Sequence, residues 1–182
     1  MARRIDYYDD PSAPKANSLV PSVNVVVTNE DGDVLLIQRS DNGNWAVPGG
    51  AIDLGESMAE AAVRETLEES GITCTINGLV GIYTDPKHIV LYTSNGEARQ
   101  EFSIVLTAVA TGGQLTPSSE TSRVVWVPRA ELDSYRMDRS MRMRVGHYLA
   151  GQSSPYLGLP ELIVPTASRI SGVARRIERL TR

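Results

Sequence analysis

Three glutamates near the middle of the chain have the spacing of a single helix face. Glu65, Glu68 and Glu69 lie three and four positions apart, a spacing that brings helix side chains to within about 5–6 Å of one another. Carboxylates this close repel, and the negative end of the helix dipole disfavours each of them by about 0.3–1 kcal/mol. A divalent cation that accepts oxygen ligands, Mg²⁺ or Mn²⁺, relieves both effects. The three residues therefore predict a metal site.

The helix that carries these glutamates has clear end signals. Ser57 is a good N-cap, Glu60 completes a capping box three residues later, and Gly71 is typical of the residue that ends a helix. The apolar residues that recur every four positions are Ala59, Val63 and Leu67. We expect this stripe to pack against a sheet and the glutamate face to lie away from the core.

Around this helix, apolar runs alternate with turns. Strands are expected at Ser22–Thr28, Val34–Arg39, Cys74–Thr84, Ile89–Thr93, Phe102–Ala110 and Arg123–Val127, and short helices at Arg129–Tyr135 and Asp138–Leu149. A short apolar run at 45–47 is ended by Pro48-Gly49-Gly50. Many strands around one central helix, with further helices near the C-terminus, indicate an α+β sandwich.

The domain organisation follows from composition along the 182 residues, about one domain in length. Residues 1–18 are expected to form a polar N-terminal arm or linker, which a partner subunit could receive. Residues 19–150 form the folded domain, and 151–160 a linker rich in Ser, Pro and Gly. Residues 161–182 predict a basic amphipathic helix, with five arginines against two glutamates. Packing on its own domain or on a sister subunit is the favoured role of this helix; contact with phosphate, nucleic acid or a membrane surface is the alternative.

Overall composition argues against several classes of protein. The net charge of −4 gives no global basic footprint, so nucleic acid is not an expected partner. The single cysteine, Cys74, excludes an internal disulfide framework and fits a reducing cytoplasm. No apolar run approaches the length of about 20 residues that spans a bilayer, and the N-terminus is too polar for a signal peptide. We expect a cytoplasmic protein.

The segment around the glutamates resembles the signature box of the Nudix hydrolases. The matching residues are Gly50, Glu56, Arg64, Glu65, Glu68, Glu69, Gly71 and Ile72. Thr66 departs from the pattern, which has an aliphatic residue there; because threonine is half apolar, we expect the metal face to stay intact. The residues Trp45, Pro48-Gly49-Gly50 and Val125-Trp126-Val127 are also similar to the family, so the resemblance extends over about Ser22 to Leu149.

The resemblance implies both a fold and a reaction. It implies a Nudix-type α/β/α sandwich with a mixed sheet over the domain at 19–150. It also implies divalent-metal-dependent hydrolysis of a nucleoside diphosphate linked to another moiety. Mg²⁺ neutralises the charge on pyrophosphate oxygens while polarising the phosphorus. Because Mg²⁺ keeps several waters, a few carboxylates suffice to hold it.

Roles for single residues follow from the same resemblance. Glu65 and Glu69, with Glu68 beside them, are the expected metal ligands, and the Gly49 carbonyl is a further ligand. Arg64 is expected to orient a glutamate of the box, with an ion pair on the helix surface as the alternative. Arg39, Trp45, Gly50 and Glu101 are assigned to substrate binding.

One more glutamate is expected as metal ligand or general base. Glu120, six residues before Trp126, fits the loop position that many relatives use, although an exposed loop acid is the alternative. Glu101, at the start of an expected strand, is its rival. His88 and His147 have no Ser, Cys or metal-ligand partner at a recognisable spacing, so neither is assigned to catalysis.

The box leaves the substrate open. ADP-ribose or a similar nucleotide sugar is the first choice, because relatives that act on ADP-ribose often carry a proline about fifteen residues beyond the box, close to Pro86. The alternatives are a pyrophosphohydrolase of oxidised nucleoside triphosphates and a non-catalytic nucleotide-binding regulator. A homodimer is a further expectation.

Overall fold

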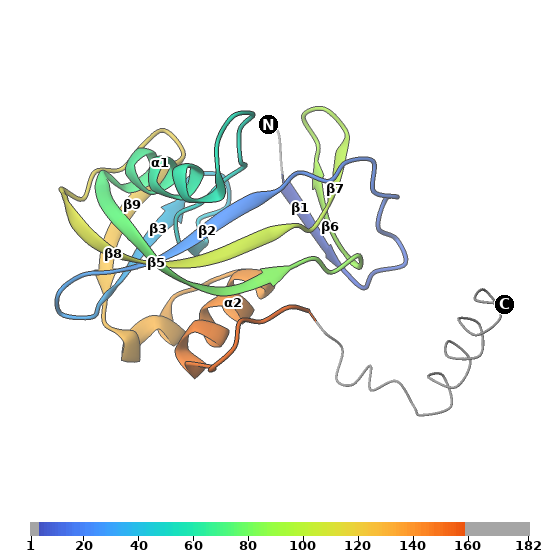
Figure 1. Cartoon of the computed structure of the whole chain (residues 1–182). Coiled ribbons are helices and arrows are strands. Elements are labelled where there is room, and N and C mark those ends of the chain that lie inside the picture. Colours follow the sequence, from blue (N-terminus) through green and yellow to red (C-terminus); the bar gives the residue numbers. More distant parts are fainter. Residues whose placement is uncertain (1–3, 159–182) are drawn as a thin grey trace, which may run out of the picture.

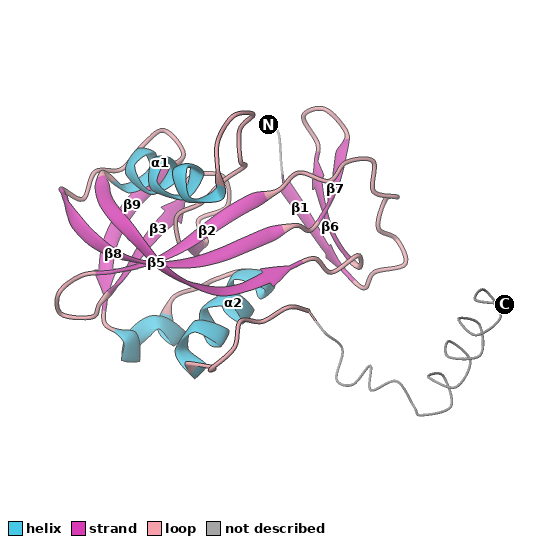
Figure 2. Cartoon of the chain, viewed as in Figure 1, coloured by secondary structure: helices cyan, strands magenta, loops and turns pink. Residues whose placement is uncertain are grey.

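The computed structural model describes residues 4–158, and these form two β-sheets and two layers of helices (Figures 1 and 2). The basic helix expected at residues 161–182 lies outside the described residues. No helix among residues 4–158 is both long enough and apolar enough to cross a lipid bilayer.

A mixed six-stranded sheet forms the centre of the molecule. Its strand order is β4 (Trp45–Ala46), β3 (Val34–Arg39), β2 (Ser22–Thr28), β8 (Ser103–Gly113) and β5 (Ile72–Tyr83), and β9 (Thr121–Val127) also pairs with β3. The pair β2–β8 is parallel, and the other pairs are antiparallel. Two of these strands, β2 and β3, have the bounds that the sequence predicts.

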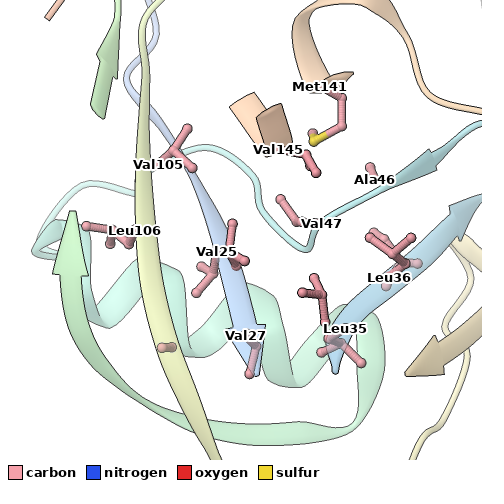
Figure 3. Packing of buried hydrophobic residues seen from close by; sticks show 14 of the residues in the cluster. Val25, Val27, Leu35, Leu36, Ala46, Val47, Val105, Leu106, Met141 and Val145 are labelled. Carbon is pink, nitrogen blue, oxygen red and sulfur yellow. The ribbon is translucent and has the colours of Figure 1, made fainter. Parts of the chain in front are cut away.

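Helices cover both faces of this sheet. Helix α1 (Met58–Ser70) lies on one face, and the 3₁₀ helix η1 (Arg129–Ser134) and helix α2 (Arg139–Ala150) lie on the other (Figure 1). Strand β2 is buried from both sides, so Val25, Val26 and Val27 are each at most 1 % exposed. In Figure 3, side chains of β2 lie between α1 and the residues Met141 and Val145 of α2. The expected α/β/α sandwich with a mixed sheet is confirmed.

The buried face of α1 differs from the predicted one. Ala59 is exposed, Val63 is only partly buried and Leu67 remains 46 % exposed. The buried residues are Ala61, Ala62, Thr66, Glu69 and Ser70. Small side chains let the helix lie close to the sheet, and the buried Thr66 hydroxyl donates to the Ala62 carbonyl at 2.8 Å, so its burial leaves no unpaired donor.

A second, three-stranded sheet contains part of the N-terminal segment. Its order is β1 (Arg4–Tyr8), β6 (His88–Tyr92) and β7 (Glu97–Gln100). The sequence predicts an arm over residues 1–18, whereas Arg4–Tyr8 pairs antiparallel with β6 along its whole length. The sequence of β1 is too polar to predict a strand. The strand forms because its charged residues are paired with each other or with β6.

Candidate functional site

The ends of α1 are fixed as the sequence predicts. The Ser57 hydroxyl accepts the Glu60 amide N–H at 3.3 Å, and the Glu60 carboxylate accepts the Ser57 amide N–H at 2.8 Å. Gly71 ends the helix in the left-handed conformation, with φ of 74°. Together these caps fix the two ends of α1. They therefore fix the position of its last two turns, which carry the glutamates, relative to the sheet.

Two of the glutamates converge on the Gly49-Gly50 turn that follows β4. The Gly49 amide N–H donates to a Glu69 carboxylate oxygen at 2.8 Å. The Glu65 carboxylate lies against the α-carbon of Gly50, where a Cβ atom would come within 2.3 Å of its Oε1. Glycine at position 50 is thus required for this close approach. The turn brings two carboxylates from successive turns of α1 to one place.

Arg64 links the acidic residues around this turn. Its guanidinium donates two hydrogen bonds to Glu56, at 2.6 and 2.8 Å, and one to Glu65 at 2.8 Å. Further bonds reach Glu68 at 3.2 Å and the Ala51 carbonyl at 3.2 Å. Planar, multidentate contacts of this kind hold carboxylates in defined orientations. This geometry supports an orienting role for Arg64. A simple ion pair on the helix surface would not include the bonds to Glu56 and to the Ala51 carbonyl.

Burial makes the negative charge on two of these carboxylates unfavourable in the absence of a cation. Burial raises the pKa of Glu69 to about 7, even though the Gly49 amide bond opposes the shift. Burial also raises the pKa of Glu65, against the opposing effect of Arg64. A bound cation would favour the charged form of both. Glu68 differs, because its side chain is 59 % exposed.

These residues fit a magnesium ion. No three His, Cys, Asp or Glu side chains between positions 4 and 158 are arranged to enclose a metal by themselves. Mg²⁺ does not need such a cage, since it retains several waters and takes one or two carboxylates. Glu65, Glu69 and the Gly49 carbonyl could supply hard oxygen ligands beside one turn, and Glu68 and Glu120 line the same cavity.

A cavity of about 510 Å³ contains most of the predicted site. The predicted residues that line it are Arg39, Gly49, Gly50, Glu65, Glu68, Glu69, Glu101 and Glu120. Arg64, which binds Glu65 and Glu68, does not itself line the cavity. A volume of this size is in the range of ligand sites.

Trp45 is not brought to the cavity. It is 8 % exposed and packs edge-on against Tyr135, with ring centroids 5.0 Å apart. The Arg123 guanidinium lies 5.4 Å from its ring centroid on another side. Its assignment to substrate binding therefore finds no support in the geometry, and packing explains why tryptophan is present.

The two candidate bases have different surroundings. Glu101 is 5 % exposed and accepts bonds from Arg144 at 2.6 Å and from the His88 Nδ1 at 3.2 Å. Despite burial, these partners lower the pKa of Glu101. The exposed carboxylate of Glu120 makes no hydrogen bond or ion pair with any residue from 4 to 158, and its charge acts on both Glu65 and Glu69. Glu120 is the better placed of the two to accept a proton.

Sequence spacing does not reveal the buried chain of charges around Glu101. His88 is 3 % exposed, and its Nε2 lies 3.0 Å from Asp6, a residue 82 positions away. Burial opposes protonation, but hydrogen bonds to Asp6 and Glu101 raise the pKa of His88. Arg144 also donates to Asn24 at 2.6 Å. The only sequence signal for Arg144 is an arginine between the buried Met141 and Val145 of α2.

Comparison with known proteins agrees with this geometry. The family model described as NUDIX domain matches residues 18–145. A MutT-like protein of Streptomyces ambofaciens is 35 % identical over 130 residues, covering 71 % of this chain and 77 % of that protein. An 8-oxo-(d)GTP phosphatase of Mycolicibacterium smegmatis is 31 % identical over 142 residues, covering 69 % and 41 %. An ADP-ribose pyrophosphatase of Methanocaldococcus jannaschii is 40 % identical over 63 residues, covering 33 % and 37 %.

A solved structure supports the fold. The MutT protein from Methanosarcina mazei Go1 superposes with a TM-score of 0.60 over 80 % of this chain and 100 % of that one, at 23 % identity. The sheet, the capped helix with its glutamates and the match over residues 18–145 agree on one assignment. The chain belongs to the Nudix family and is a Nudix pyrophosphohydrolase.

Proposed function

We propose that this enzyme cleaves the diphosphate bond of a nucleoside diphosphate derivative with Mg²⁺, or Mn²⁺ in its place, held by Glu65 and Glu69. The observation that carries the proposal is the convergence of these two carboxylates on the Gly49-Gly50 turn within the cavity. Bound there, the ion would neutralise phosphate charge and acidify a water molecule.

The protein's own residues do the remaining work. Arg64 fixes the Glu65 carboxylate through the bonds that also hold Glu56, so the ligand oxygen is presented in one orientation. Glu120 accepts the proton of the attacking water. The water oxygen bonds to phosphorus as the bridging P–O bond breaks, and the leaving phosphate oxygen is protonated from solvent. The products are a phosphate ester and a second phosphate compound.

Two substrate classes have support, and the support for one is stronger than the support for the other. The position of Pro86 in the sequence favours ADP-ribose or a similar nucleotide sugar, and the Methanocaldococcus jannaschii relative supports this class over 63 residues. Pro86, however, lies in the turn after β5, where the Asp85 side chain accepts the Lys87 amide at 2.9 Å, and does not line the main cavity. An oxidised nucleoside triphosphate is the second candidate, supported over 142 residues by the Mycolicibacterium smegmatis relative.

Kinetics on a substrate panel test the reaction. Wild type and Glu69→Gln are compared on ADP-ribose, dGTP and 8-oxo-dGTP with Mg²⁺, with the exposed turn residue Glu30→Gln as the matched control. Because the amide keeps the shape but removes the charge, kcat/KM should fall at least about 100-fold in Glu69→Gln and stay unchanged in Glu30→Gln. Equal rates in wild type and Glu69→Gln would overturn the proposal. A wild type that binds nucleotide without cleaving any substrate would favour the non-catalytic regulator.

A further inference from the structure

Three arginines of the molecule share one local arrangement. Each is held by a carboxylate two positions away in the sequence, through its Nε and Nη2 atoms, at distances between 2.7 and 3.0 Å. The pairs are Arg4 with Asp6, Arg39 with Asp41, and Arg99 with Glu97. A fork held at both Nε and Nη2 has a fixed plane, and its Nη1 group is left for another acceptor. Within residues 4–158 none of the three Nη1 groups makes a hydrogen bond or ion pair.

The arginines face the cavity and their acids do not. Arg4, Arg39 and Arg99 line the main cavity, whereas all three partner carboxylates are outside its lining. The three come from β1, from the end of β3 and from β7, so both sheets contribute to the same wall. We call these three residues the arginine wall. The carboxylates orient the guanidinium groups from behind and leave positive charge at the cavity surface.

Charge interactions connect the arginine wall with the predicted metal ligands. The charge of Glu69 acts on Arg39, and the charge of Arg4 repels those of both Arg39 and Arg99. The carboxylate partners offset part of this repulsion, and an anion bound in the cavity would offset more of it. The positive region therefore begins near the glutamates and continues away from them towards β1 and β7.

Glu101 and Asp138 are the other acids in the cavity lining, and the charge of Asp138 acts on Arg4. Glu101 is bound by Arg144 and His88. Asp138 is the N-cap of α2 and accepts the Met141 amide at 2.8 Å. Both carboxylates thus already have donors of their own. The Nη1 groups of the arginine wall are therefore the donors that an anionic group of a ligand could engage.

We propose that the arginine wall binds a phosphate of the substrate that lies outside the diphosphate held at the glutamates, as in the polyphosphate chain of a nucleoside triphosphate. This inference rests on the proposed function, because it takes the glutamates as the site of the cleaved bond. A nucleotide sugar, whose chain has no such phosphate, offers Arg4 and Arg99 no phosphate group to bind. The three-stranded sheet that includes the N-terminal strand is then part of the substrate site.

Binding of non-hydrolysable analogues tests this without requiring catalysis. Titration calorimetry with Mg²⁺ compares α,β-methylene triphosphates with the matching diphosphates, on adenosine and on deoxyguanosine. The proteins are wild type, Arg4→Gln, Arg99→Gln and Arg129→Gln. Arg129 is the matched control, since its guanidinium lies over the Tyr148 ring, 4.8 Å from the centroid, and does not line the cavity.

The inference predicts a selective loss. Wild type should bind at least one triphosphate more tightly than its diphosphate, and each wall variant should weaken triphosphate binding about 10-fold while leaving the diphosphate nearly unchanged. Arg129→Gln should match wild type. Because the triphosphate-to-diphosphate ratio does not depend on how much of a variant is folded, partial unfolding of the whole domain cannot mimic this result. Equal weakening of both analogues, no weakening, or no triphosphate binding by wild type would overturn the inference, whether or not the enzyme cleaves any substrate.

Discussion

Replacing Gly50 by alanine would put a methyl group where the Glu65 carboxylate now lies. The added Cβ would come 2.3 Å from Oε1 and 2.5 Å from the carboxyl carbon, whereas ordinary contact begins at 3.4 Å. The carboxylate oxygen must therefore retreat by about 1 Å. Gly50 is not among the residues with positive φ, so alanine can adopt its backbone conformation. The perturbation acts on the position of one carboxylate.

A displacement of this size should be severe for catalysis and mild for folding. Misplacing a reacting geometry by about 1 Å costs on the order of 100-fold in rate. We expect kcat/KM of Gly50→Ala to fall by about that factor, and the Mg²⁺ concentration for half-maximal activity to rise. The free energy of unfolding should change by less than about 1 kcal/mol, because the displaced group is the far end of a flexible side chain.

The assay is steady-state kinetics across a Mg²⁺ titration, with urea unfolding measured in parallel. Gly146→Ala is the matched control, since it lies in α2 with no atom within 4 Å of the added Cβ. That variant should gain about 0.5–1 kcal/mol of stability and keep its activity. Wild-type kcat/KM and wild-type Mg²⁺ dependence in Gly50→Ala would refute the reasoning, because Glu65 would then not need the position described.

Two further predictions concern charged networks. Arg64→Lys keeps the charge but cannot bridge Glu56 and Glu65 with a planar fork, so the Mg²⁺ concentration for half-maximal activity should rise about 10–100-fold; an unchanged Mg²⁺ titration would contradict the orienting role. His88 has a pKa raised above its unfolded value of 6.5 by its two carboxylate partners, in spite of burial. Its stabilising contribution is therefore complete below about pH 6.5 and is lost as the pH rises through the folded pKa. The difference in free energy of unfolding between wild type and His88→Gln, measured in urea from pH 6 to pH 9, should shrink with rising pH, and a constant difference would exclude this linkage.

Local signals in the sequence were sufficient for the helix ends and the central strands. The Ser57–Glu60 box and Gly71 depend on residues within one turn, so pattern and structure agree. The bounds of β2 and β3 follow from apolar runs, rich in valine in β2, on either side of the acidic Glu30-Asp31-Gly32-Asp33 turn. The resemblance to the Nudix box predicts, without any information about the fold, that Glu65 and Glu69 lie at one site.

Features that depend on distant partners could not be predicted in this way. The charged residues of β1 are satisfied by neighbours such as His88, 82 positions from Asp6, so composition alone favours an arm. The buried face of α1 contains Thr66, whose hydroxyl donates to a carbonyl of the same helix. A search for apolar periodicity does not treat such a threonine as a buried residue. Glu69 turns inward because a backbone amide of the Gly49-Gly50 turn receives it. Each of these outcomes is decided by a tertiary contact.

The parallel pairing of β2 with β8 has a consequence for how the chain matures on the ribosome. Ser22 lies opposite Ser103, a partner 81 residues further along the chain. Closing so long a segment is entropically costly, and folds dominated by such pairings form slowly. The valine-rich β2 must therefore wait, with its backbone unpaired on that side, until translation has passed β8. During that interval the unpaired edge of β2 is a site at which the nascent chain can associate with other chains.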